Sequence, residues 1–316
     1  MSGDGGWEAL ERALAASELA GIEVVRRRPS AYRTSFPVEE LEVERAGPGR
    51  GTIVCKRPNW EELDATARLA KPRFLHESGR EACVYEHLLP RGPAGPPRFL
   101  GAASDEGRSW LFIERIEGRS LVEIGEREIW EEAARWLARF HGAFAGQELG
   151  GCPLVERDAG FHRSWLARAR GFAADDSRRA TLEWLVPRHE AVVEALAAMP
   201  RTLLHGEFYA ANVLIDDRGA GVRVAPVDWE LAGPGPGTLD LAALVSGWPA
   251  ADRAAMREAY VEASGAAAPN PRDLELARLQ VAIQWLGWAP PEWEPPPGQR
   301  HDWAAEAVEI AEELEL

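Results

Sequence analysis

HGEFYAAN at residues 205–212 and VDWE at residues 227–230 decide the fold of this chain. These two stretches place an acid, Glu207, five residues before an amide, Asn212, and a second acid, Asp228, a further sixteen residues on. Each residue taken alone fits a surface acid or a turn asparagine. The information lies in the order and the spacing of the three together.

Short apolar runs flank these residues and predict how they meet. Three strands and one turn are predicted, at residues 201–204, 213–215 and 222–227, with the turn Asp-Asp-Arg-Gly at 216–219. The last strand delivers Asp228 at its end. A strand–loop–strand–turn–strand path of this kind brings Glu207, Asn212 and Asp228 together, although they are distant in sequence.

HGEFYAANVL and VDWE resemble the signature of the aminoglycoside phosphotransferase and choline kinase-like family of small-molecule kinases. The family pattern is His-Gly-Asp, four variable residues and Asn, followed by a strand that ends in Asp-Trp-Glu or Asp-Phe-Glu. This chain departs from it at Glu207, where the family has Asp. The resemblance implies an α+β, protein-kinase-like fold with two lobes, a small β-rich N-lobe and a larger, mainly helical C-lobe. It also implies Mg²⁺-dependent transfer of the γ-phosphoryl group of ATP to a hydroxyl group of a small molecule.

The resemblance also assigns roles to the three residues. Glu207 takes the position of the catalytic base, and Asn212 and Asp228 offer the hard oxygen ligands that Mg²⁺ prefers. The extra methylene of Glu207 moves its carboxylate about 1.5 Å outward on an unchanged backbone. Three interpretations stay open: a working base on a slightly recessed loop, a mispositioned base in a slow enzyme, and a catalytically silent, nucleotide-binding pseudokinase with a regulatory role.

The first third of the sequence predicts a small sheet and a helix that supply the nucleotide side. Strands are predicted at 22–27, 41–44, 52–56, 98–102 and 110–113, and a helix at 77–89. Lys56 ends the third strand, where an ammonium group can reach the α- and β-phosphates. Glu81 lies in the middle of an apolar helical stripe of Val84, Tyr85 and Leu88. A carboxylate on a buried face requires a partner, and we expect Lys56 to fill that role, as in the kinase Lys–Glu ion pair.

Further nucleotide contacts are predicted at a loop and at the segment that joins the lobes. Residues 30–35 contain no glycine, and their hydroxyl groups, including Ser35 and Thr34, are candidates for phosphate contacts, although a plain hairpin turn fits almost as well. Residues 110–118 resemble the family's hinge, where backbone groups near Glu114 and Ile116 would bond the adenine edge. We therefore divide the chain into a nucleotide-binding N-lobe, 1–117, and a C-lobe, 118–316, with the catalytic loop and the substrate-binding helical region.

Most of the C-lobe is predicted to be helical. Helices are expected at 130–144, 164–172, 180–199, 252–264, 271–288 and 302–314, and another at 7–20 begins the N-lobe. His205 and His141 are expected to pack in the core instead of binding metal. By the resemblance, Asp240 braces the catalytic loop and caps the helix that follows it.

Composition limits the partners and the compartment. Thirty-six basic against fifty-one acidic residues give a net charge of −15, which argues against a nucleic-acid partner and is compatible with a cationic substrate. Cys55, Cys83 and Cys152 show no C-x-x-C spacing, and their odd number favours a reducing compartment. The N-terminal residues do not resemble a signal peptide, and no apolar run approaches ~18 residues. We therefore expect a cytoplasmic protein without a membrane span.

The acceptor is predicted to lie between Glu207 and the helical lobe. Four tryptophans cluster near the C-terminus: Trp285, Trp288, Trp293 and Trp303. Aromatic rings can hold a cation or a sugar face, although core packing is their commoner role. Glu292 and Glu294 could meet an amine or remain solvated. The acceptor classes left open are an amino sugar, an aminoglycoside, an amino alcohol and a natural-product hydroxyl.

Overall fold

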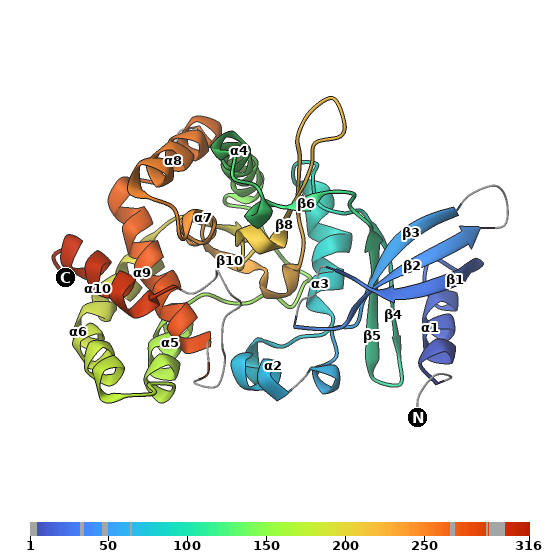
Figure 1. Ribbon diagram of the computed structural model, residues 1–316, viewed down its shortest axis with the longest axis horizontal. Coiled ribbons are helices and arrows are strands. Elements are labelled where there is room, and N and C mark those ends of the chain that lie inside the picture. The colour runs from blue at the N-terminus through green and yellow to red at the C-terminus, as the bar shows by residue number, and fades with distance from the viewer. Residues whose placement is uncertain are drawn as a thin grey trace.

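The chain forms strands first and helices afterwards (Figure 1). The structure is a computed structural model that describes residues 5–31, 35–45, 50–63, 65–265, 269–288, 290 and 301–316. Its N-terminal part is built on an antiparallel sheet and its C-terminal part is mostly helical, so the predicted α+β class is confirmed. In the part of the chain that is described, no helix is long and apolar enough to cross a membrane.

The N-terminal sheet has five strands in the order β1-β2-β3-β5-β4, and each neighbouring pair is antiparallel. The strands are β1 (Ile22–Pro29), β2 (Val38–Arg45), β3 (Arg50–Lys56), β4 (Phe99–Asp105) and β5 (Arg108–Glu114). Side chains alternate between the two faces of a strand, so Cys55 and Lys56 point in opposite directions. Lys56 pairs with Leu111 of β5 and therefore starts from the middle of the sheet.

The two faces of this sheet pack against different helices. Helix α1 (Gly5–Ala15) covers one face, where Leu10 and Leu14 pack with Cys55. Helix α3 (Arg80–Cys83) lies between the sheet and the helical part (Figure 1) and continues as a π-helical turn, Val84–Leu88, and a 3-10 turn, Leu89–Arg91. The predicted helix at 77–89 is thus present, in three successive helical forms. Pro90 lies in the last turn, where a missing N–H group ends regular helix.

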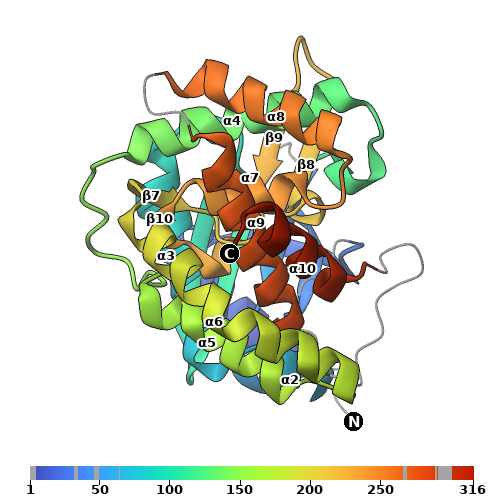
Figure 2. The same ribbon diagram turned by 90° about the vertical axis from the view of Figure 1, so that its left-hand side faces the viewer.

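The C-terminal part contains two small sheets and a set of helices. The helices are α4 (Arg127–Phe144), α5 (Ala159–Gly171), α6 (Asp176–Ala198), α7 (Thr238–Val245), α8 (Ala250–Ser264), α9 (Pro271–Trp288) and α10 (Trp303–Glu313). In Figure 2, α4 lies along α8, and α9 runs between α7 and α10. One sheet pairs β7 (Arg201–Leu204) with β10 (Gly233–Pro236), and the other orders β6 (Arg119–Ser120), β8 (Val213–Asp216) and β9 (Arg223–Pro226) as β6-β8-β9. The path predicted around the two motifs is therefore present as β7, β8 and β9.

A short segment that the sequence patterns did not reveal connects β3 to α3. It contains helix α2 (Ala65–Ala70) and 3-10 turns at Trp60–Glu62 and Arg73–Leu75. Arg168 of α5 donates hydrogen bonds to the carbonyl groups of Leu69 (2.5 Å) and Ala70 (2.7 Å). The segment is therefore fastened to the helical part of the molecule, near α5 in Figure 1.

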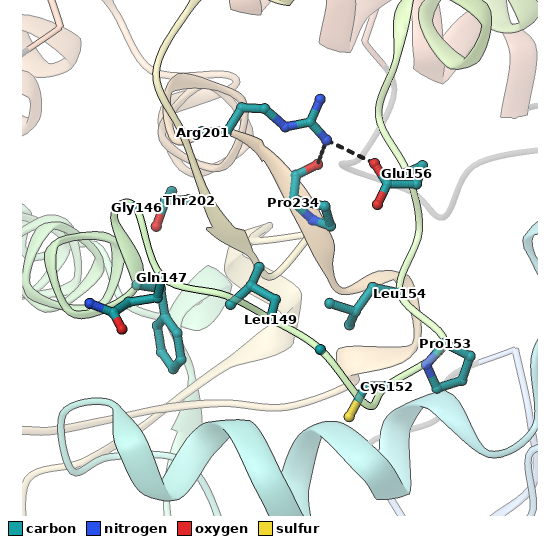
Figure 3. A pocket seen from close by; sticks show the side chains of 12 residues that line it. Gly146, Gln147, Leu149, Cys152, Pro153, Leu154, Glu156, Arg201, Thr202 and Pro234 are labelled. Atoms are coloured by element: carbon teal, nitrogen blue, oxygen red, sulfur yellow. Dashed lines mark hydrogen bonds and ion pairs between the residues drawn. The ribbon is translucent and has the colours of Figure 1, made fainter.

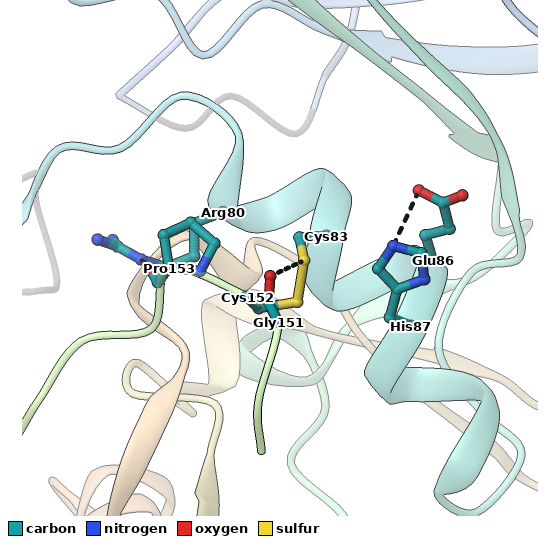
Figure 4. Close-up of a disulfide and its surroundings, with 7 residues drawn as sticks. All are labelled: Arg80, Cys83, Glu86, His87, Gly151, Cys152 and Pro153. Atoms are coloured by element: carbon teal, nitrogen blue, oxygen red, sulfur yellow. Dashed lines mark hydrogen bonds and ion pairs between the residues drawn. A yellow bond between two sulfur atoms is a disulfide. The ribbon is translucent and has the colours of Figure 1, made fainter.

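One covalent link joins the two parts. Cys83 at the end of α3 forms a disulfide with Cys152, which lies in the segment between α4 and α5 (Figure 4). The odd cysteine count did not predict this pairing. The two cysteines are 69 residues apart and acquire their proximity only from the packing of α3 on the C-terminal part. Cys55 remains a free thiol, buried beneath α1.

Candidate active site

The loop that carries Glu207 leaves β7 at Leu204 through a glycine that no other residue can replace without strain. Gly206 has φ +91°, and a Cβ atom placed on it would lie 2.3 Å from the carbonyl oxygen of Leu231. His205 is fully buried, and its Nε2 donates to the carbonyl of Val227 at 2.9 Å. The ring thus packs and bonds backbone, as predicted, and joins the catalytic loop to the strand that leads to Asp228.

Asp240 holds the same loop from the other side. Its carboxylate accepts the backbone N–H groups of His205 at 2.6 Å and Gly206 at 2.9 Å. Burial acts to raise the pKa of Asp240, but hydrogen bonding from His141 and the loop outweighs it, so the pKa lies below its ordinary value. The bracing role is as expected, whereas the capping role is wrong. Asp240 lies inside the first turn of α7, whose N-cap is Gly237, and its oxygens are already taken by the loop.

A buried cluster of charge joins the sheet, α3 and the end of β9. Lys56 Nζ lies 2.6 Å from Glu81 Oε2 and also contacts a carboxylate oxygen of Asp228. The side chains are 4%, 2% and 7% exposed, so these charges interact with little screening by water. The predicted Lys56–Glu81 ion pair is therefore present, and it includes Asp228 as a third member.

The ionisation of this cluster follows from burial and from mutual charge. Burial acts to lower the pKa of Lys56, but the carboxylates of Asp228 and Glu81 outweigh it and raise the pKa well above its ordinary value. Burial raises the pKa of Glu81 to about 7, although Lys56 favours its charged form. In Asp228 the charges of Lys56 and Lys71 outweigh burial and lower the pKa. Lys56 and Asp228 are thus held in their charged forms.

Asp228 has an unusual backbone conformation. Its φ of +69° and ψ of 59° place it in the left-handed region, which residues other than glycine seldom occupy. Such a conformation costs about 1–3 kcal/mol and persists where the surrounding structure imposes it. The turn redirects the chain after β9 and sends the carboxylate toward Lys56.

The donor atoms near Asp228 fit a magnesium ion. Asn212 donates its Nδ2 to the carbonyl of Glu207 at 3.0 Å, which orients the amide and leaves Oδ1 as an oxygen donor. Asp228 adds a carboxylate. Among the described residues no group of three His, Cys, Asp or Glu side chains is arranged to hold a metal. Two protein ligands are nevertheless what Mg²⁺ needs when phosphate oxygens and water complete its shell.

Glu207 is half-buried and lies within reach of several charges. Loss of hydration is the main cause that raises its pKa to about 8, and the negative charges of Glu230 and Asp228 act in the same direction. Lys71 and Lys56 oppose the shift. The carboxyl group at the position of the expected base therefore takes up a proton more readily than an ordinary glutamate.

Two site residues were not predicted, namely Lys71 and the Glu230 of the VDWE motif. Lys71 Nζ lies 2.5 Å from Glu230 Oε1, and both side chains are buried. Lys71 follows α2, in the segment for which no pattern was recognised. Its charge acts on Glu207 and Asp228, so it belongs to the same cluster.

The other predicted nucleotide residues are Ser35, Glu114 and Ile116. Ser35 is half-buried in a bend, whereas Thr34 falls outside the described residues. The carboxylate of Glu114 accepts two hydrogen bonds from Arg223, each 3.0 Å long, and this contact lowers its pKa although burial opposes the shift. Ile116 is buried with Leu214. The side chains of Glu114 and Ile116 are thus structural, and only their backbone groups stay candidates for adenine.

Three of the C-terminal tryptophans are placed by the structure. Trp285 stacks on Trp303 with ring centroids 5.4 Å apart, and Tyr209 contacts Trp285 at 5.0 Å. Trp288 packs against Trp165 of α5. Trp293, Glu292 and Glu294 lie outside the described residues. Because Tyr209 is two residues from Glu207, the Trp285–Trp303 pair is connected to the catalytic loop.

An open cavity of about 710 Å³ lies apart from these residues (Figure 3). It is lined by the segment between α4 and α5 and by the ends of β7 and β10, with Gln147, Leu154 and Arg201 among its residues. None of the candidate catalytic, nucleotide-binding or metal-binding residues lines it. We therefore assign it no part in the chemistry of the charged cluster.

Comparisons with known proteins agree with this geometry. The family model described as "Phosphotransferase enzyme family" matches residues 42–278. No curated protein sequence matches the chain. Among solved structures, it is similar to a microcompartment-associated aminopropanol kinase, with 14% identity, 97% of this chain and 94% of the other covered, and a TM-score of 0.62.

Two further solved structures show the same likeness. The complex of APH(2")-IIia with GDP and kanamycin has 11% identity, covers 97% of this chain and 98% of its own, and has a TM-score of 0.60. The macrolide 2'-phosphotransferase MphH from Brachybacterium faecium has 20% identity, the same two coverages and a TM-score of 0.59. At such identities the likeness shows the fold, and it confirms the predicted protein-kinase-like architecture.

Proposed function

The chain belongs to the phosphotransferase enzyme family, and we propose that it transfers the γ-phosphoryl group of ATP to a hydroxyl group of a small molecule. The observation that carries the proposal is the meeting of Lys56, Glu81 and Asp228 in one buried cluster beside Asn212 and Glu207. A structural ion pair would not require an amide and a strained aspartate next to it. Phosphoryl transfer requires all of them, because it depends on positioning and on stabilisation of charge.

Each residue has a defined part in the reaction. Lys56, oriented by Glu81, binds the α- and β-phosphates. Asn212 and Asp228 would hold Mg²⁺, which would offset the negative charge on the phosphate oxygens. Glu207 orients the acceptor hydroxyl and accepts its proton. The acceptor oxygen forms a bond to the γ-phosphorus while the bond from that phosphorus to the β–γ bridging oxygen breaks, and ADP leaves with the bonding electron pair.

The net charge of the cluster supports a divalent cation and a cationic acceptor. Four carboxyl groups, those of Glu81, Glu207, Asp228 and Glu230, face two ammonium groups, Lys56 and Lys71. Fully ionised, this arrangement has an excess of negative charge, which Mg²⁺ would neutralise. The acceptors that suit an acidic, partly aromatic surrounding are amino alcohols, amino sugars and aminoglycosides, with an uncharged natural-product hydroxyl as the remaining class.

The proposed roles of the two lobes follow their order in the chain. We assign the nucleotide to residues 1–117 and the acceptor to residues 118–316, with the backbone near Glu114 and Ile116 holding the adenine and Ser35 facing the phosphates. The Trp285–Trp303 pair forms the nearest aromatic wall on the acceptor side, because Tyr209 links it to the catalytic loop.

A panel assay tests the proposal. Purified protein with ATP and Mg²⁺ is incubated with amino alcohols, amino sugars, aminoglycosides and macrolides, and ³¹P NMR follows the formation of a phosphate monoester and ADP. The matched control is Asp228→Asn, which keeps the size of the side chain. Nucleotide binding without transfer to any acceptor would favour the alternative, a pseudokinase with a regulatory role. Absence of nucleotide binding would refute both.

A further inference from the structure

Lys56 and Lys71 are the only lysines among the thirty-six basic residues of this chain, and every other one is an arginine. Both are buried, with 3% and 2% of their surface exposed. Both point into the same cluster of carboxylates, Lys56 at Glu81 and Asp228 and Lys71 at Glu230. The protein thus uses guanidinium groups wherever positive charge meets solvent, and ammonium groups only in the site.

The placement of lysine and arginine is informative because ammonium and guanidinium groups differ chemically. An ammonium group is a compact point charge with three donors that can rotate, whereas guanidinium is planar and fixed in shape. Burial of either is costly unless it is paired. A position that only had to neutralise Glu230 would accept an arginine, as Glu114 accepts Arg223 and Glu40 accepts Arg28. A lysine at residue 71 suits a small anion that needs one concentrated charge.

The backbone on both sides of Lys71 is constrained. Arg168 from α5 donates to the two carbonyl groups that precede it, those of Leu69 and Ala70, and its Nε donates to Gly287 at the end of α9. Pro72 follows directly and restricts the backbone on the other side. The ammonium group is therefore carried by the connection between β3 and α3 but anchored from the helical part.

Both ammonium groups lie close to one aromatic ring, that of Phe36. Lys71 Nζ lies 4.6 Å from the ring centroid of Phe36, and Lys56 Nζ lies 5.8 Å from it. Phe36 follows Ser35 in the loop that is assigned to the phosphates. Lys56 is the nearer cation to Glu81 and Asp228, and Lys71 the nearer one to Glu230.

We propose that Lys71 is a second phosphate-binding ammonium group, which contacts the terminal phosphoryl group during its transfer while Lys56 binds the inner phosphates. The inference rests on the proposed function. Glu230 holds the ammonium group in position, and the phosphoryl oxygens compete with Glu230 for it. A cation placed on a transferring phosphoryl group stabilises the charge that spreads over its three oxygens.

The scarcity of lysine allows a direct test in the intact protein. Wild type labelled with [ε-¹³C]lysine should give two side-chain signals, and either Lys71→Met or Lys56→Met assigns them. With Mg²⁺, we expect ADP to shift the Lys56 signal, and a non-hydrolysable ATP analogue to shift both. A Lys71 signal that stays unchanged with the analogue while that of Lys56 moves would overturn the inference and leave the proposed function intact. If neither signal moves, the proposed function is wrong and the inference falls with it.

Kinetics supply a second measurement. Lys71→Met should lower kcat about 10³-fold, the lower range for loss of a cation on the transferring group, while the KM for ATP changes little. Lys71→Arg should recover only part of the rate, because the planar cation does not fit the same position. The matched control is Arg73→Met, which removes a positive charge from an exposed position in the same segment and should leave kcat unchanged.

Thermal stability distinguishes catalysis from structural support. Replacing a merely structural lysine by methionine would lower the melting temperature and leave kcat below that temperature as in wild type. That result would overturn the inference.

Discussion

Glu81 accepts a hydrogen bond from the backbone N–H of Trp229, with N and Oε1 3.2 Å apart. Its other carboxylate oxygen contacts Lys56. One side chain on α3 therefore holds both Lys56, the proposed phosphate-binding residue, and the residue that directly follows Asp228. Arg80, beside it on the helix, donates to the carbonyl of Glu230 at 2.6 Å. The position of α3 thus determines the geometry of the nucleotide side and of the metal side together.

The first prediction concerns the Lys56–Glu81 ion pair. Lys56→Met and Glu81→Gln should each lower kcat/KM about 10²-fold, because either change displaces a phosphate-positioning group. The double variant should be less impaired than the product of the two effects, since the residues act as a unit. Glu86→Gln, an exposed acid on the same helix, is the control and should match wild type. Multiplicative effects in the double variant would show that the two side chains act independently.

The second prediction concerns the metal. Asp228→Asn should abolish Mg²⁺-dependent turnover and leave the fold intact, because asparagine tolerates the left-handed backbone but lacks the charge that binds the cation. Product formation and the thermal unfolding curve are the two measurements. Asp217→Asn, an acid in the turn between β8 and β9, should have no effect on either. A fully active Asp228→Asn enzyme would refute the assigned mechanism.

The third prediction concerns the unusual acid. Glu207→Gln keeps the shape and removes the charge, so transfer should fall about 10²–10⁴-fold while ATP still binds. Glu207→Asp should also lower the rate if the loop has adapted to the longer side chain. A faster Asp variant would mean that glutamate is a handicap at this position and that the protein has drifted toward regulation. Wild-type rates in both variants would remove Glu207 from the mechanism.

The fourth prediction follows from the raised pKa of Glu207, about 8 against an ordinary 4.5. The base must be ionised, so kcat/KM should fall about tenfold per pH unit below that pKa, and Mg²⁺, by adding positive charge, should move the limb to lower pH. The folded chain holds this proton more tightly than the unfolded chain does. Stability should therefore decrease as the pH rises from 4.5 to about 8, and Glu207→Gln should remove that component. A rate that is independent of pH across this window would contradict the assignment.

The fifth prediction concerns the Cys83–Cys152 disulfide. It closes a long loop, with a sequence separation of 69, and its loss should cost about 4 kcal/mol through the greater freedom of the unfolded chain. Cys83→Ser, Cys152→Ser and the double variant should unfold at one common, lower temperature, which dithiothreitol does not change. Cys55→Ala should respond to the reductant as wild type does. If the reductant leaves the melting temperature of the wild type unchanged, the bridge does not form.

Short-range patterns predicted the fold well because they record local physics. The apolar run in residues 52–56 predicted β3, and the apolar stripe around Glu81 predicted which face of α3 is buried. The buried partner of Glu81 followed from the cost of an unpaired carboxylate. The spacing of the two motifs predicted that Asn212 and Asp228 meet, and both lie at the same end of β8 and β9. Apart from the resemblance, these predictions used only residues close together in the sequence. They did not require knowledge of which distant segments pack together.

Long-range packing accounts for what the sequence did not predict. Cys83 and Cys152 meet only because α3 packs on the C-terminal part. The role of Asp240 as a helix cap was wrong because the catalytic loop competes for the same oxygens. Lys71 lies next to a helix of six residues, too short to show a period, and its position depends on the hydrogen bonds that Arg168 donates to Leu69 and Ala70. Its one signal in the sequence was the rarity of lysine.

The rarity of lysine limits the number of side-chain amines that a reagent can modify in this protein. Reagents that acylate or alkylate amines normally coat a protein through its many surface lysines, but here the only side-chain amines lie beneath the surface, at the phosphates' assigned position. A nucleotide analogue that carries an aldehyde or an activated ester on its phosphate chain would meet two targets and little competition. The raised pKa of Lys56 keeps its amine protonated and slows this reaction, so covalent labelling would be directed to the site by binding of the analogue and by the scarcity of other lysines.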